Sequence, residues 1–164
     1  MGSELEELRA LLDRYGQKVD AEKTVFKVTT INCIDVSVPA SPRVYWIETT
    51  MPVQTMPRAT SAVSEKEREV RVTPPRGARL IEQKDGGLYV AYSGTEADLR
   101  KRLKQHLFNE GHPKTVKLGC KIDKEPFSLY QWRAGFVTID SYEIRYAIEL
   151  WWRLNKGWPK FCLR

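Results

Sequence analysis

The feature that most constrains the fold is the stretch Leu88–Leu107, LYVAYSGTEADLRKRLKQHL, which joins two patterns of different period. Residues 88–94 are rich in aromatic and β-branched side chains, as is typical of a strand, and a Ser-Gly pair closes them. Leucines then recur at helical spacing, at Leu99, Leu103 and Leu107. The pattern predicts a helix over residues 95–110, with Thr95 as its N-cap and Gly111 at its C-terminal stop.

Helices are also predicted near both ends of the chain. Residues 3–15 begin with a capping-box pattern and repeat apolar side chains at helical spacing, and we expect Gly16 to end them. Residues 142–155, YEIRYAIELWWRLN, show the same spacing, and either Asp140 or Ser141 is expected to cap them.

The remaining apolar segments have the composition of strands: residues 24–38 (one or two strands), 43–48, 78–83 and 127–139. Residues 78–83 and 88–94 flank the pair Asp85-Gly86, which predicts a β-hairpin. Residues 49–77 contain four prolines and five threonines and predict a long loop, with REVRV as its one candidate strand. The order of elements predicts an α+β fold with a small, mostly antiparallel sheet flanked by helices, in one domain over residues 1–164.

Charge and composition narrow the class of partner. The net charge is +6, and residues 99–124 carry eight Lys or Arg against two acidic residues, which favours a polyanion such as nucleic acid. An ordinary solvated face remains the alternative for this basic stretch. The three cysteines are far apart and match no zinc pattern, which predicts reduced thiols and a cytoplasmic protein. No apolar run is long enough to predict a membrane span.

The basic helix has two different sides. On a helical wheel, Arg102 and His106 lie four residues apart on one side of the leucine stripe, whereas Arg100 and Lys104 lie on the other. Arg102 and His106 are therefore expected to point together at a site beside the Tyr-Ser-Gly turn. An amphipathic helix with basic, solvent-facing side chains is the alternative.

The segment YSGTEADLRKRLKQH resembles the second half of the GIY-YIG nuclease signature, in Tyr92, Gly94, Arg102 and His106. The resemblance implies a partner strand for residues 88–94 that carries a second tyrosine. Within RVYWIE, Tyr45 stands in the tyrosine place and Arg43 replaces the family's glycine. Residues 43–48 and 87–155 would then form the catalytic core, residues 1–40 an N-terminal addition and residues 49–86 an insertion.

The resemblance also implies a catalytic glutamate on a later helix, for which Glu149 is the candidate metal ligand. Glu149 suits Mg²⁺ (or Mn²⁺), since Mg²⁺ takes one or two protein carboxylates and keeps several waters. The wheel places five residues of this helix toward the core: Ile144, Ala147, Ile148, Trp151 and Leu154. Glu149 then falls on the opposite, exposed side, where ion pairs with both Arg145 and Arg153 are the alternative to metal binding.

The implied function is a metal-dependent endonuclease acting on double-stranded DNA, similar to small restriction endonucleases. Arg102 would hold the scissile phosphate, Tyr45 or Tyr92 would activate water, and His106 would orient a group or relay a proton. Further basic side chains would contact phosphates: Arg100, Lys101, Lys104, Lys114, Lys117 and Lys121.

Several alternatives stay open. They are a non-catalytic nucleic-acid-binding module, a homing or repair nuclease, and an RNA-cleaving nuclease. The family's asparagine after a Pro-Trp pair is absent near Trp158 and Pro159, which keeps the non-catalytic alternative in play. A homodimer is possible, and the sequence does not select between one subunit and two.

Overall fold

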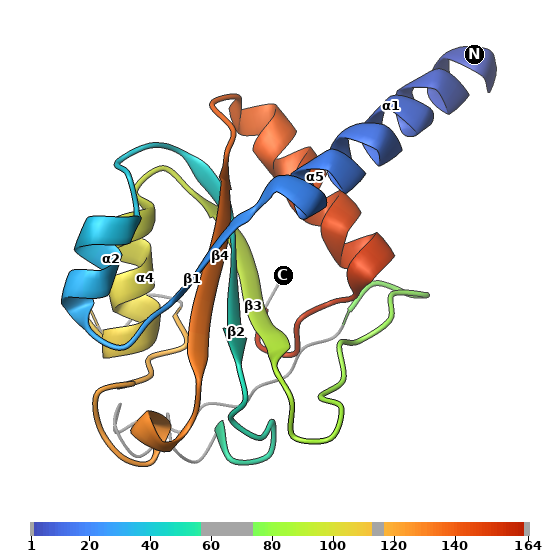
Figure 1. The fold of residues 1–164 in the computed structure, drawn as a ribbon. Helices are drawn as coiled ribbons and strands as arrows, with labels where there is room; N and C mark the ends of the chain where they lie inside the picture. Colours follow the sequence, from blue (N-terminus) through green and yellow to red (C-terminus); the bar gives the residue numbers. More distant parts are fainter. Residues whose placement is uncertain (1, 57–73, 113–116, 163–164) are drawn as a thin grey trace.

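The computed structural model describes residues 2–56, 74–112 and 117–162, and its centre is an antiparallel sheet of four strands (Figure 1). Their order across the sheet is β1 (Thr24–Lys27), β4 (Trp132–Thr138), β2 (Arg43–Thr49) and β3 (Tyr89–Glu96). The helices are α1 (Gly2–Glu22), α2 (Ile31–Ser37), α4 (Leu99–Phe108) and α5 (Tyr142–Lys156), with a 3₁₀ turn at Phe127–Leu129. The predicted α+β fold is confirmed.

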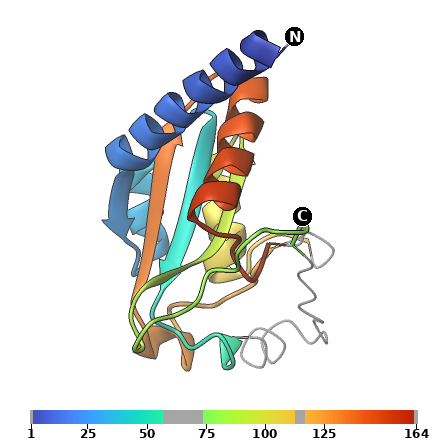
Figure 2. The same cartoon turned by 90° about the vertical axis from the view of Figure 1, so that its right-hand side faces the viewer.

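Helices cover both faces of the sheet (Figures 1 and 2). The period-two alternation of β2 serves both layers. Tyr45 and Ile47 belong to the core cluster on the side of α2 and α4, whereas Val44 and Trp46 pack with the tryptophans of α5. Within the described part of the chain, no helix is both long enough and apolar enough to span a membrane.

The prediction that Gly16 ends the first helix is wrong, because α1 continues to Glu22. Gly16 is buried in the middle of α1, and a Cβ there would overlap the indole ring of Trp151. The glycine thus permits α1 to cross α5 closely. The crossing is fixed by Asp13, which accepts a hydrogen bond of 2.7 Å from Trp151 Nε1.

The prediction for residues 24–38 is also corrected, since β1 is followed by the helix α2 and not by a second strand. The Oγ1 of Thr30 caps α2 by accepting from the Cys33 N–H at 3.4 Å, and Ile34 is the buried side chain of this short helix. A helix this short shows too few periodic positions to be separated from a strand by pattern alone.

The predicted hairpin is the third correction. The Asp85-Gly86 turn exists, and Gly87 N donates to Lys84 O at 2.8 Å. Residues 78–83 nevertheless form no strand; Leu80 makes an isolated bridge with Trp158 instead. β3 pairs with β2, so the position beside it in the sheet is filled from far away in sequence. REVRV lies outside the described residues.

Candidate active site

The strand pair β2–β3 brings the two signature tyrosines together. Tyr45 lies opposite Gly94 in the antiparallel register, and Ile47 lies opposite Tyr92. The predicted pairing of residues 43–48 with the Tyr-Ser-Gly strand is therefore confirmed. A Cβ at position 94 would lie 2.8 Å from Tyr45 Oη, so the glycine makes room for the phenol. The Tyr45 and Tyr92 rings are stacked, with centroids 6.1 Å apart.

The helix α4 begins later than predicted, because β3 runs on through Thr95 to Glu96. Asp98, not Thr95, is the N-cap, and its carboxylate accepts from the Lys101 N–H at 3.1 Å. The helix ends at Phe108, where Asn109 adopts a left-handed conformation (φ 54°).

Arg102 and His106 share a side of α4, as predicted, but at different depths. Arg102 is half-buried, lines a cleft beside β3 and donates to Gln105 Oε1 at 3.0 Å. His106 is fully buried beneath the tyrosines, with its ring centroid 4.3 Å from that of Tyr92.

His106 is held between two hydrogen-bond partners. Its Nδ1 accepts from the Leu118 N–H at 3.0 Å, and its Nε2 lies 2.9 Å from Tyr45 Oη. Because Nδ1 is an acceptor, the ring proton of a neutral imidazole resides on Nε2, which donates to the phenol oxygen. His106 thus fixes the orientation of Tyr45, and the phenol proton of Tyr45 is directed elsewhere.

The placement of α5 differs most from the wheel prediction. Ile144 and Leu154 are exposed, by 45% and 52%, whereas Glu149 is only 9% exposed. Glu149 forms an ion pair with Arg153, one turn further along the helix. Arg145 instead donates to the carbonyl oxygens of residues 139 and 140. The expectation of an exposed Glu149 is therefore wrong, and the Arg153 half of the alternative ion pair is correct.

Arg153 joins Glu149 to the strand that carries Tyr92. Its Nε donates to Ser93 Oγ at 2.9 Å, and its Nη2 donates to the Ser93 carbonyl oxygen at 2.8 Å. Its guanidinium also lies over the Trp158 ring, 5.0 Å from the centroid. These contacts span α5 and β3, so the carboxylate of Glu149 has a fixed position relative to the tyrosines.

These side chains converge on one cleft of about 940 Å³ at the β3 edge of the sheet. Four of the five predicted catalytic residues line it: Tyr45, Tyr92, Arg102 and Glu149. His106 lies behind Tyr45 and does not line the cleft. The wall also contains residues that sequence reasoning did not assign to the site: Ser93, Thr95, Tyr146, Trp158 and Cys162. Arg153 also lines the cleft, and the sequence does indicate it, because it stands four residues after Glu149 on the same helix.

Burial opposes ionisation in this cleft. Burial raises the pKa of Tyr45 well above its ordinary value, and the neighbouring Tyr92 adds to this, whereas the Arg102 guanidinium lowers it. Burial likewise raises the pKa of Tyr92, again against the effect of Arg102. Burial raises the pKa of Glu149 as well, and the charge of Arg153 lowers it. The two arginines are therefore the groups that favour negative charge in the cleft.

The predicted phosphate contacts are scattered and differ in availability. Arg100 donates through Nε to the Val38 carbonyl, and Lys104 pairs with Asp35 at 2.8 Å, so both are directed at α2 and its C-terminal end. Lys117 is 7% exposed, and its Nζ donates to three carbonyl oxygens at the end of α4. Of the others, Lys101 is exposed, Lys121 is half-buried and Lys114 lies outside the described residues.

The donor set sets limits on a metal ion. Within residues 2–56, 74–112 and 117–162, no three His, Cys, Asp or Glu residues gather to hold one. A single carboxylate, Glu149, stands on the wall of a cleft with ample volume for a hydrated ion. That arrangement fits Mg²⁺ bound through one carboxylate, waters and substrate oxygens, and it does not fit a closed, all-protein site.

Comparison with known proteins gives no relative: no protein-family model, curated protein or solved structure matches this chain. The functional reading therefore depends on the geometry of the cleft and on the sequence resemblance.

Proposed function

We propose that the protein is a metal-dependent endonuclease of the GIY-YIG type that hydrolyses phosphodiester bonds in double-stranded DNA. The single observation that carries the proposal is the convergence of Tyr45, Tyr92, Arg102 and Glu149 on one cleft. These residues come from β2, β3, α4 and α5, so their spacing in sequence does not by itself bring them together.

The cleft supplies positive charge where hydrolysis develops negative charge. Attack on a phosphodiester increases the charge on the non-bridging oxygens, and a guanidinium fork suits two of them. Arg102 would bind the scissile phosphate there, beside the two phenols whose pKa values it already lowers.

The tyrosines would position and deprotonate the attacking water. Tyr45 is the better-placed candidate base, because His106 donates to its oxygen and Arg102 favours its ionised form against the effect of burial. The phenol would first release its proton through the cleft to solvent, and the phenolate would then accept a proton from the attacking water. Tyr92 lines the same wall and is the second candidate base.

Glu149 would hold Mg²⁺ or Mn²⁺, and the ion, when bound, would stabilise charge on the leaving oxygen. Arg153 holds the carboxylate in place and favours its ionised form against the effect of burial, since it pairs with Glu149 and is itself anchored on Ser93. A recognition sequence of the restriction type would be read by parts of the chain other than this cleft.

A cleavage assay tests the proposal. Supercoiled plasmid and end-labelled duplexes are incubated with the full chain and Mg²⁺ or Mn²⁺, beside Arg102→Ala and Glu149→Gln. We expect each variant to cleave at least about 100-fold more slowly, as for loss of one group that stabilises transition-state charge. Two exposed residues outside the cleft provide matched controls, Arg76→Ala and Glu82→Gln, which should cleave at the wild-type rate. Full activity in either cleft variant would place the chemistry elsewhere.

One observation favours a second candidate, a nucleic-acid-binding module without hydrolysis. The ion pair with Arg153 already occupies the carboxylate that the metal requires. The two candidates are separated by measuring the binding of a labelled duplex through its fluorescence anisotropy, in the presence of EDTA. Retained binding with no cleavage in Mg²⁺ or Mn²⁺ would support the module and reject the enzyme.

A further inference from the structure

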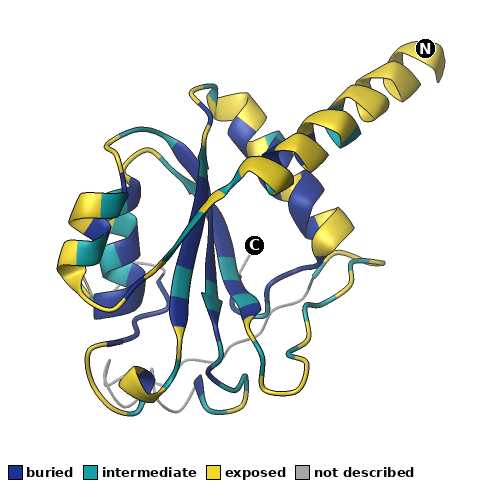
Figure 3. Ribbon diagram, viewed as in Figure 1, coloured by how far each residue is buried: buried dark blue, intermediate teal, exposed yellow. Residues whose placement is uncertain are grey.

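The N-terminal half of α1 projects beyond the rest of the fold and is mostly exposed (Figures 1 and 3). It carries a row of exposed apolar side chains. Leu8 is 61% exposed, Leu11 is 55% exposed and Tyr15 is 39% exposed. Their spacing of three and then four residues is that of one seam of a coiled coil. No described element covers them. An apolar row on an otherwise charged helix indicates a contact with another protein surface.

This row is not the face by which α1 packs on its own subunit. Contact with α5 is made by Gly16 and Val19, both buried, and by the Asp13 carboxylate. At 100° per residue, these positions centre on a different side of the helix from Leu8 and Leu11. The outer row can therefore take a partner without disturbing α5 or the cleft.

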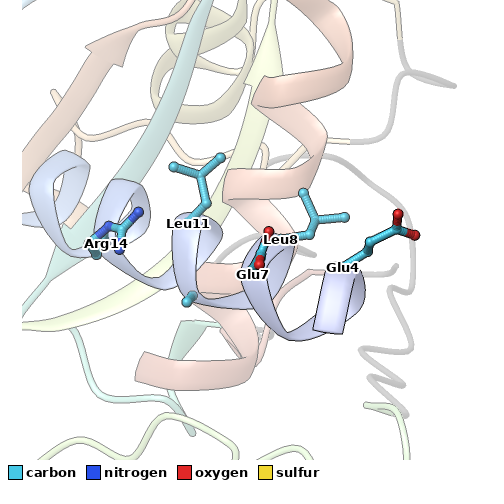
Figure 4. Close-up of a pocket in the computed structure, with 6 residues that line it drawn as sticks. Glu4, Glu7, Leu8, Leu11 and Arg14 are labelled. Atoms are coloured by element: carbon cyan, nitrogen blue, oxygen red, sulfur yellow. The ribbon is translucent and has the colours of Figure 1, made fainter. Parts of the chain in front are cut away.

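The charges beside the row are segregated along the helix. Glu4 and Glu7 lie toward one end and Arg14 toward the other, and together with Leu8 and Leu11 they line a shallow hollow on α1 (Figure 4). Glu7 and Arg14 are seven residues apart, so they occupy the same flank of the seam. This flank, acidic at Glu7 and basic at Arg14, is complementary to a reversed copy of itself.

We propose that α1 is the interface of a homodimer, in which two α1 helices pack antiparallel about a two-fold axis between Leu8 and Leu11. Leu8 then packs against Leu11 of the partner subunit, and Glu7 lies beside Arg14 of the partner subunit, twice by symmetry. A parallel pair would bring the two acidic ends together and align the two helix dipoles unfavourably. The proposal rests on α1 alone and does not depend on the proposed nuclease function.

The seam is short, which makes the expected association weak. Interfaces of small area are transient, and a dissociation constant on the order of 10 µM is expected. Sedimentation velocity on the full chain, from about 1 to 300 µM, should show a monomer converting to a dimer with rising concentration. A chain that stays monomeric throughout this range would overturn the proposal.

Substitutions locate the interface. Leu8→Glu with Leu11→Glu should weaken association at least tenfold, because the seam would bury like charges. The matched control changes two equally exposed apolar residues elsewhere, Val36→Glu with Leu129→Glu, and should leave dimerisation unchanged. Circular dichroism verifies that both variants are folded. Dimerisation that survives the α1 substitutions, or that only the control abolishes, would assign the interface to another surface.

Direction is tested by cross-linking and by charge reversal. Proteins with one introduced cysteine, Glu4→Cys or Tyr15→Cys, are made in a Cys33→Ser background, in which the two remaining native cysteines, Cys120 and Cys162, are buried. The two proteins are mixed and oxidised, and the linked peptides are identified by mass spectrometry. The antiparallel pair predicts position 4 linked to position 15, whereas a parallel pair predicts 4 linked to 4. Glu7→Arg should weaken the dimer a few-fold, and Glu7→Arg with Arg14→Glu should restore it. Predominant 4-to-4 linkage, or a failure of the double reversal to restore association, would refute the antiparallel arrangement.

Discussion

The hydrogen-bonded chain Tyr45–His106–Leu118 predicts a measurable non-additivity in folding stability. His106 has no solvent exposure and uses both ring nitrogens, toward Tyr45 Oη at 2.9 Å and the Leu118 N–H at 3.0 Å. His106→Leu removes the imidazole partner of two buried polar groups, Tyr45 Oη and the Leu118 N–H, and each loss costs about 1–3 kcal/mol. Tyr45→Phe removes the acceptor of the His106 Nε2–H and likewise costs about 1–3 kcal/mol. The two single variants together affect three polar groups, whereas the double variant affects only the Leu118 N–H, so its destabilisation should be smaller than the sum by about 2–6 kcal/mol.

Urea unfolding followed by tryptophan fluorescence measures all four free energies of unfolding. The control is Tyr92→Phe, since the ring of Tyr92 also touches His106, yet the Tyr45 oxygen is the phenol bonded to Nε2. Tyr92→Phe and His106→Leu should be additive within about 0.5 kcal/mol. If the Tyr45 cycle proves equally additive, the hydrogen bond between Tyr45 and His106 contributes nothing, and the reasoning that orients the tyrosine fails.

Three further predictions concern packing and charge. Gly16→Ala should destabilise the fold by about 1–3 kcal/mol in urea unfolding, because its Cβ overlaps Trp151; an unchanged midpoint would mean that α1 does not cross α5 as closely as described. Gly94→Ala should also destabilise the fold by about 1–3 kcal/mol and should displace the Tyr45 phenol. The displacement would be measured as shifted Tyr45 ring signals in NMR spectra, and unshifted signals would contradict the contact. Burial raises the pKa of Asp20, but hydrogen bonds with Lys23 and Trp152 outweigh this effect and hold the pKa below its ordinary value of 3.8. The contribution of Asp20 to the free energy of unfolding is therefore present above pH 3.8 and is lost as the pH falls through the folded-state pKa. Asp20→Asn should therefore flatten the acid limb of stability against pH, and an unaltered limb would remove Asp20 as its source.

Matched substitutions accompany the two glycine changes. Gly2→Ala places a Cβ where no atom lies within 4 Å, and its unfolding midpoint should not fall. Gly135→Ala places a Cβ 3.3 Å from a methyl group of Val25, which can give way, so a smaller loss than for Gly94→Ala is expected.

The strand–helix core could be predicted from sequence because its signals are local. The leucine stripe of α4 and the strand composition of β2 are each recognised correctly in a short window. The start of α5 is predicted at either Asp140 or Ser141, and Ser141 is the cap. The pairing of Tyr45 with Gly94 is a long-range contact, and only the resemblance to a nuclease signature supplied it.

The orientation of α5 could not be predicted, because the rule that charged residues face water fails there. Glu149 and Arg153 neutralise each other, and Ser93 accepts hydrogen bonds from Nε and Nη2 of the arginine, so burial of both is tolerable. Ile148 and Trp151 are buried as the wheel predicts, whereas Ile144 and Leu154 are exposed. No periodicity in the helix itself reveals that its polar side meets a strand edge.

Gly16 shows a similar limit for helix ends. A glycine after an apolar stretch ordinarily marks a C-terminus, since it adopts a left-handed conformation at low cost. Here the same residue is required for close approach to Trp151, a contact that lies far along the chain. Local sequence does not distinguish these two uses of glycine.

Because Thr49 pairs with Tyr89, the arrangement of the site does not depend on the length of the chain between these two residues. These two residues are opposite each other at the ends of β2 and β3, so the connecting segment leaves and returns at the same point of the sheet. The entropy of closing such a connection grows slowly, by about 0.6 kcal/mol for each doubling of its length. Changes in the length of this segment can therefore accumulate without altering the register that sets Tyr45 beside Tyr92.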